Sequence, residues 1–118
     1  MNTKTIAILA LSLSAAACTG TMHMASVSEA FKKYEKQDYE ATLKLVAQAE
    51  STGKMSEAQE AQLIYLKALA YDGLGDTGTA KTLFAYVAEQ HPQSHYAYLA
   101  AGRLSADGRQ LSEPRGKH

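Results

Sequence analysis

The spacing of the apolar residues restricts this chain to a helical fold. From Ser26 onward, apolar side chains recur at intervals of three and four residues, beginning with Val27, Ala30, Phe31 and Tyr34. This is the spacing of one face of an α-helix. No run of alternating β-branched and polar residues lies between turn signals, as is typical of a strand. A chain of 118 residues is long enough for one domain. We therefore expect a single all-α domain.

Start and stop signals divide the periodic region into about five helices in antiparallel pairs. Asp38 has the position of an N-cap, and Ser56 and Gln59 have the spacing of a capping box, in which each side chain satisfies a free amide of the first turn. Gly73 and Gly75 are expected to stop the third helix. The expected helices are 27–36, 39 to about 50, 57 to about 73, a fourth that follows Asp76 or Thr77 and is closed by Pro92, and a fifth that Ser94 opens and that ends near 106.

Each helix has residues that we expect to face the core. The expected core residues of the third helix occupy one face of that helix. Those of the fourth helix are grouped around Phe84. We expect Ala68, Ala80 and Gly102 to let helix backbones approach one another. Besides the four residues of the first helix, the expected inward residues are Ala41, Leu45, Val46, Ile64, Ala68, Tyr71, Ala80, Leu83, Phe84 and Val87.

Charge and cysteine content exclude several classes of protein. Twelve Lys and Arg residues balance twelve Asp and Glu residues, and the pI is near 6.9. No global field therefore draws the chain to nucleic acid or to an anionic membrane. A single cysteine cannot form an internal disulfide. We expect no nucleic-acid partner and no cofactor.

The N-terminus has the layout of an export signal. Lys4 precedes a short apolar run over residues 6–13, and small residues follow it. The run is too short for a transmembrane helix, which needs roughly twenty residues. Ala15 and Ala17 satisfy an A-x-A cleavage site, whereas the alanines before Cys18 resemble the lipobox of bacterial lipoproteins, with Ala15 where Leu is usual. We favour the lipobox.

The lipoprotein resemblance implies that Cys18 becomes the acylated first residue of the mature protein. Thr19, rather than Asp, follows the cysteine, and in this family that favours the periplasmic face of the outer membrane. The expected organisation is a signal peptide over 1–17, a flexible tether over 18–25, a helical domain over 26–106 and a disordered tail over 107–118.

Residues 61–94 resemble a tetratricopeptide repeat (TPR), a unit of 34 residues built from two helices. A further unit restarts with Tyr98, Ala101 and Gly102, and residues 38–41 resemble the second helix of an earlier unit. Residues 91–104 are similar to repeats of outer-membrane lipoproteins of the barrel-assembly and cell-division-coordination types. The positions that match the repeat pattern are Ile64, Ala68, Tyr71, Gly75, Asp76, Ala80, Phe84 and Pro92.

The repeat resemblance implies a short TPR-like solenoid whose first helices form a concave surface for a protein partner. It implies that the chain is a non-enzymatic adaptor, anchored by lipid in the cell envelope, that binds another envelope protein. The residues that match the concave-face positions of the family are Gln62, Tyr65, Leu69, Asp72, Tyr96, Leu99 and Arg103.

Two alternative functions remain open at this point. Met22, His23 and Met24 offer the soft ligands that select Cu(I), so a metal-handling lipoprotein is the first. The second is an accessory subunit of an envelope enzyme or assembly complex. Residues 73–78 spell G-x-G-x-x-G, but a helix rather than a strand precedes them, which argues against a dinucleotide site.

The fifth expected helix has apolar residues all around it. Residues 95–104 place tyrosine, leucine and alanine on every side. We expect this helix to dock on a partner or on a second copy in a homodimer. The alternative is that Tyr96 and Tyr98 lay their rings along the fourth helix and turn their hydroxyl groups to solvent.

Overall fold

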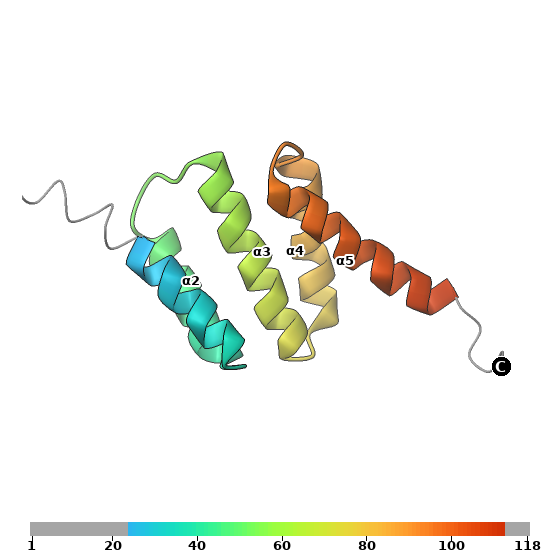
Figure 1. Ribbon diagram of the computed structural model, residues 1–118, viewed down its shortest axis with the longest axis horizontal. Helices are drawn as coiled ribbons and strands as arrows, with labels where there is room; N and C mark the ends of the chain where they lie inside the picture. The colour runs from blue at the N-terminus through green and yellow to red at the C-terminus, as the bar shows by residue number, and fades with distance from the viewer. Residues whose placement is uncertain (1–23, 113–118) are drawn as a thin grey trace, which may run out of the picture.

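The computed structural model describes residues 24–112, with side chains described for residues 24–106. This part of the chain is helical and contains no strand (Figure 1). An N-terminal helix covers residues 24–35. It is followed by α2 (Tyr39–Glu50), α3 (Glu57–Gly73), α4 (Thr77–Gln90) and α5 (His95–Ser112). The all-α expectation is confirmed.

The predicted N-caps are present. The carboxylate of Asp38 accepts a hydrogen bond from the Ala41 amide, and that of Asp76 accepts one from the Thr79 amide. At the start of α3, the capping box of Ser56 and Gln59 is complete in both directions. These caps satisfy amides that have no partner within the helix. The starts of α2, α3 and α4 are therefore set by local sequence.

The predicted end of the fifth helix is wrong. The helix was expected to stop near residue 106, but α5 continues to Ser112. The Asp107-Gly108 pair that suggested a stop costs a helix only about 1 kcal/mol, and Arg109, Gln110 and Leu111 are acceptable helix formers. The first helix likewise begins at residue 24, inside the predicted tether. Residues 1–23 and 113–118 lie outside the described residues.

Helix α3 is packed on two sides rather than one. Leu63 and Leu66 are fully buried in one core cluster, which they form with Ala30, Val46 and Ala49. On the other side of α3, Ala61, Ala68 and Leu69 join a cluster with α4 and α5, which includes Phe84, Val87 and Ala100. The sequence suggested a single inward face on this helix. A helix with neighbours on both sides must instead bury two apolar stripes.

Thr42 is a buried polar residue that the inward pattern did not include. Its side chain has no exposed area, and its hydroxyl donates to the Asp38 carbonyl at 2.8 Å. The hydrogen bond satisfies the hydroxyl within its own helix. The buried position therefore leaves no unsatisfied hydroxyl.

The turn between α3 and α4 explains the glycines of the G-x-G-x-x-G segment. Gly75 has a φ of +86°, in the left-handed region that favours glycine. A Cβ on Gly73 would lie 2.4 Å from the ring of Tyr39. Any residue larger than glycine at position 73 would therefore force the Tyr39 ring of α2 to shift. Both glycines have structural roles, as expected of the turn between paired helices.

The helices form two layers. In Figure 1 the N-terminal helix, α3 and α5 lie toward the viewer, and α2 and α4 lie partly behind them. Consecutive helices from α2 to α5 contact one another, and α3 also contacts α5. Residues from the N-terminal helix, α3 and α5 thus share one face of the molecule. Within residues 24–112, no helix combines the length and apolar character needed to cross a membrane.

Candidate protein-binding face

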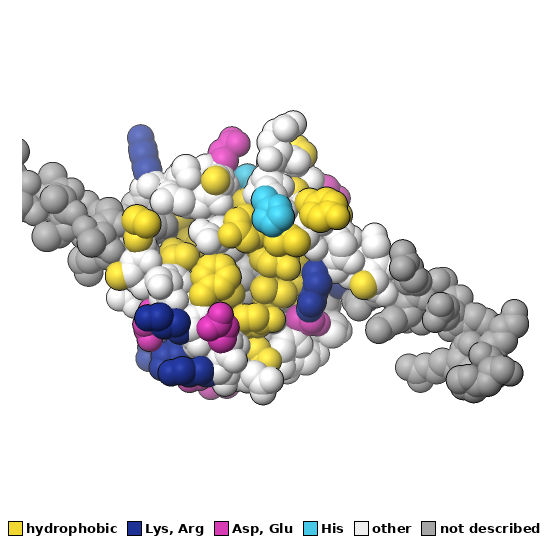
Figure 2. Space-filling view, viewed as in Figure 1, with side chains coloured by type: hydrophobic (Ala, Val, Ile, Leu, Met, Phe, Trp, Pro, Cys, Tyr) yellow, Lys and Arg dark blue, Asp and Glu magenta, His cyan; other side chains and the backbone are white. Residues whose placement is uncertain are grey.

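The face shared by the N-terminal helix, α3 and α5 carries most of the side chains that the sequence assigned to partner binding. Figure 2 shows hydrophobic side chains gathered over the middle of this face, with charged side chains toward its lower edge. We call it the three-helix face. Its predicted members on α3 are Gln62, Tyr65, Leu69 and Asp72, and those on α5 are Tyr96, Leu99 and Arg103.

Three aromatic rings join α3 to the two helices that follow it. The Tyr65 ring lies 5.5 Å from that of Tyr96 on α5 and 5.6 Å from that of Phe84 on α4, measured between centroids. Both pairs are tilted, an arrangement that aromatic rings favour. Phe84 is buried, whereas Tyr65 and Tyr96 are half-buried. Part of each tyrosine ring is therefore accessible at the surface, while contacts with neighbouring rings fix its position.

An ion pair bridges α3 and α5 beside these rings. The Arg103 guanidinium donates to the Asp72 carboxylate at 2.5 Å. The Arg103 Cζ also lies 5.6 Å from the centre of the Phe84 ring, within the range of a cation–π contact. A pocket of about 200 Å³ adjoins the pair, lined by these three residues together with Thr77, Ala80, Lys81, Leu104 and Ala106. The predicted residues Asp72 and Arg103 are thus partners of each other.

The pKa of the Tyr65 hydroxyl is raised above its usual value of 10.0. Loss of solvent around the ionised oxygen is the largest cause, and Tyr34 and Tyr96 add to it, whereas Arg103 opposes it. Tyr65 therefore remains a neutral hydrogen-bonding group well beyond physiological pH. It can donate or accept a hydrogen bond at the surface of the three-helix face.

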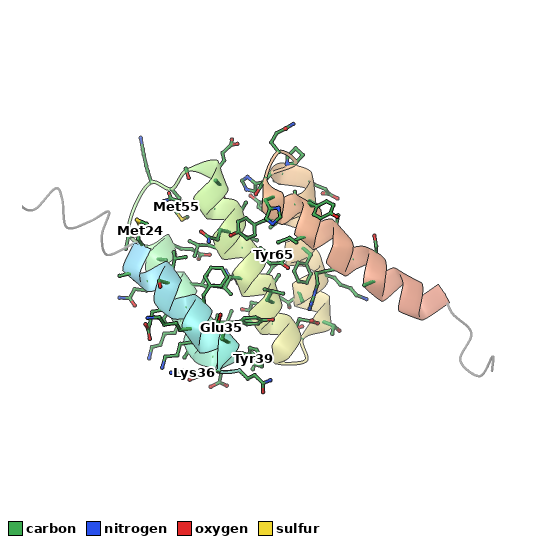
Figure 3. All side chains as sticks on the ribbon, in the orientation of Figure 1. Met24, Glu35, Lys36, Tyr39, Met55 and Tyr65 are labelled. Carbon is green, nitrogen blue, oxygen red and sulfur yellow. The ribbon has the colours of Figure 1, made fainter. Side chains whose placement is uncertain are left out.

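A second region of the three-helix face lies between the N-terminal helix and α3. A pocket of about 410 Å³ is lined by Gln62 and Gln59 of α3 and by residues of the N-terminal helix. Gln62 was predicted from the sequence to contact a partner, whereas the other residues that line this pocket were not. Figure 3 shows Met24 at the start of the N-terminal helix, and Tyr65 farther along α3. The lining from the N-terminal helix is Met24, Val27, Ser28 and Phe31.

The two leucines among the predicted contact residues differ in exposure. Leu69 is only 8% exposed and belongs to the core, so its assignment to a contact surface is wrong. It matches a concave-face position of the repeat family, but packing with α4 and α5 covers it. Leu99 is half-buried and keeps part of its surface.

The tyrosines of α5 divide between the two orientations considered from the sequence. Tyr96 turns inward against Tyr65 of α3, whereas Tyr98 is 77% exposed and stacks only on His95 of its own helix. The alternative in which both rings lie along the fourth helix is therefore not observed, because Tyr96 packs against α3 and Tyr98 is left exposed. Successive positions on this helix face different directions, so one of the two rings is left outside.

His91 is the one histidine buried in the part of the chain with described side chains. It is 8% exposed, and neither ring nitrogen has a hydrogen-bond partner. Its Nε2 lies 3.8 Å from a Glu60 carboxylate oxygen. Within the described range, no three His, Cys, Asp or Glu side chains come together to hold a metal. Of the proposed copper ligands, Met22 and His23 lie outside that range, and Met24 belongs to the pocket above.

The chain matches no protein-family model, and comparisons with curated proteins and with solved structures give no significant match. Cys18, the predicted signal peptide and the predicted lipobox lie outside the described residues.

Proposed function

We propose that this protein is a non-enzymatic adaptor that binds another protein of the cell envelope through its three-helix face. The observation that carries the proposal is the half-exposed pair of tyrosines, Tyr65 and Tyr96. Tyr65 packs on Phe84, and Arg103, paired with Asp72, lies over the Phe84 ring. Tyrosine and arginine are enriched among residues that dominate binding energy at protein interfaces. A rigid aromatic pair loses little conformational entropy when it binds.

The tetratricopeptide resemblance supports the same face. In that family the first helix of each pair lines the binding surface, and the N-terminal helix, α3 and α5 would have this role in a short TPR-like solenoid. The contact between α3 and α5, which are not consecutive, is compatible with such stacking. The lipobox resemblance at Cys18 supplies the proposed location, on the periplasmic face of the outer membrane.

Site-specific photo-crosslinking in cells tests the proposed face. A photoreactive amino acid replaces Gln62, on the three-helix face, or Gln48, an exposed residue of α2. We expect a crosslinked protein adduct from position 62 and none from position 48. The adduct is identified by mass spectrometry. Equal adducts from both positions, or none from position 62, would contradict the proposal.

A pair of charge reversals provides the second test. Arg103→Glu places a second carboxylate next to Asp72, which repels it, and removes the cation from the Phe84 ring. We therefore expect at least a tenfold loss of the crosslinked adduct at position 62. Lys44→Glu reverses a charge on the exposed side of α2 and should leave the adduct unchanged. Circular dichroism of both variants verifies that they remain folded. An adduct that persists in a folded Arg103→Glu protein would count against the three-helix face.

A further inference from the structure

The pocket between the N-terminal helix and α3 begins at Met24, the first residue that the structure describes. Its volume is about 410 Å³. The lining residues on the N-terminal helix recur at the i, i+3, i+4 and i+7 positions, so the pocket follows one side of that helix. We call it the Met24 pocket. Its lining is Met24, Val27, Ser28, Phe31, Gln59 and Gln62.

The Met24 pocket suits an uncharged and flexible apolar chain. None of its six lining residues carries a charge, so a charged ligand would find no opposite charge in the lining. Val27 and Phe31 are half-buried and pack against the buried cluster that contains Ala30 and Val46, which holds their apolar surfaces in place. Met24 is 70% exposed, and its flexible thioether side chain can adapt to an apolar group.

The chain that precedes Met24 is long enough to return to this pocket. Cys18 stands six positions before Met24. Six residues span at most about 20 Å when extended, whereas the helix rises about 10 Å from Met24 to Phe31. Gly20 lies in the intervening segment, and glycine permits the reversal of direction that a return requires. The segment therefore has enough length to bring a group on Cys18 to the pocket.

We propose that an acyl chain on Cys18 folds back into the Met24 pocket when it is not inserted in a membrane. This inference rests on the acylation of Cys18 in the proposed function. Binding in the pocket removes methylene groups from water, which is the main favourable term for an alkyl chain. Attachment through Cys18 keeps this chain at a high effective concentration near the pocket, which favours it over a free fatty acid from solution.

An occupied Met24 pocket covers the part of the three-helix face that includes Gln62. A partner that contacts Gln62 then competes with the acyl chain for the same surface. Insertion of the acyl chain into a membrane removes it from the pocket and leaves the whole face open. The proposal therefore makes partner binding depend on attachment to the membrane.

Photo-crosslinking of an attached alkyl chain identifies the occupant. Cys18 is the single cysteine of the chain, so a maleimide carrying a palmitoyl-length chain with a diazirine labels the purified full chain at one position. On irradiation we expect a crosslink to the tryptic peptide 55–67 of the same molecule, which contains Gln59 and Gln62. We expect none to the tryptic peptide 82–103, which belongs to α4 and α5.

A matched pair of substitutions tests whether the pocket itself is responsible. Ser28→Glu adds a carboxylate at an exposed position of the lining, and it should reduce the crosslink at least tenfold because the alkyl chain then meets a charge. Gln48→Glu adds the same charge at an exposed position of α2 and should leave the crosslink unchanged. Circular dichroism verifies that both labelled variants are folded.

The label is attached chemically, so its position does not depend on acylation in cells, which palmitate labelling measures separately. A missing crosslink to peptide 55–67 overturns the proposal and leaves the adaptor function to its own tests. Equal crosslinking in the Ser28→Glu and Gln48→Glu chains also overturns it. In a mixture of isotopically labelled and unlabelled protein, crosslinks that join only different copies would likewise exclude folding back within one chain.

Discussion

Tyr65 illustrates how a single residue connects the core to the proposed binding face. Its ring contacts Phe84 beneath it and Tyr96 beside it, and burial raises the pKa of its hydroxyl. The folded state therefore holds the phenolic proton more tightly than the unfolded chain does. The resulting stabilisation is complete below the unfolded pKa of about 10 and is lost as the pH rises through the folded pKa.

The thermal midpoint measured at alkaline pH tests the contribution of the Tyr65 hydroxyl. We expect the thermal midpoint to fall between pH 9 and pH 11, and to fall less steeply in Tyr65→Phe, which keeps the ring contacts but has no proton to lose. Tyr98→Phe is the matched control, because Tyr98 is largely exposed, and it should behave as the parent chain does. A pH profile that is identical in Tyr65→Phe and the parent would refute the role given to the Tyr65 hydroxyl.

At the scale of the helices, the N-caps decide where the elements begin. The Asp76 carboxylate accepts from the Thr79 amide and hydroxyl, at 3.2 and 2.8 Å. Asp76→Ala removes both bonds and should lower the free energy of unfolding by about 1 kcal/mol. For a domain of this size, that corresponds to a decrease of about 4–8 °C in the thermal midpoint.

Denaturant unfolding of two variants at position 76 separates the effect of the cap hydrogen bond from the effect of the Asp76 charge. Asp76→Asn keeps an oxygen that can accept from the Thr79 amide, so we expect it to retain most of the stability. If Asp76→Ala and Asp76→Asn destabilise the protein equally, the charge of Asp76 rather than the cap hydrogen bond stabilises the start of α4.

For the whole molecule, the decisive question is attachment to the membrane through Cys18. We expect Cys18→Ser to move the protein from the membrane fraction to the soluble fraction of cells, because acyl chains contribute about 0.8 kcal/mol per buried methylene and no other anchor is proposed. Incorporation of labelled palmitate into the parent, but not the variant, checks the chemistry. An unlabelled parent protein, or a mature mass that matches an unmodified N-terminus, would reject lipidation.

The sequence by itself determined the helical class and most helix boundaries, because caps and glycine turns act over only a few residues. Asp38, Ser56 and Asp76 occupy the cap positions predicted for them. The repeat resemblance, rather than local spacing, placed Tyr65 and Asp72 of α3 on the same surface as Tyr96 and Arg103 of α5, and these residues meet as two pairs.

Only the tertiary structure decided which of those positions remain accessible. Leu69 matches a concave-face position of the repeat family, yet neighbouring helices bury it. The pocket that joins Met24 to Gln62 depends on how the N-terminal helix lies against α3, which no short-range pattern specifies. Gly73 meets the ring of Tyr39 from another helix, whereas Gly102 meets nothing within 4 Å. A residue's surroundings depend on contacts between segments distant in sequence, and periodicity describes only the helix to which the residue belongs.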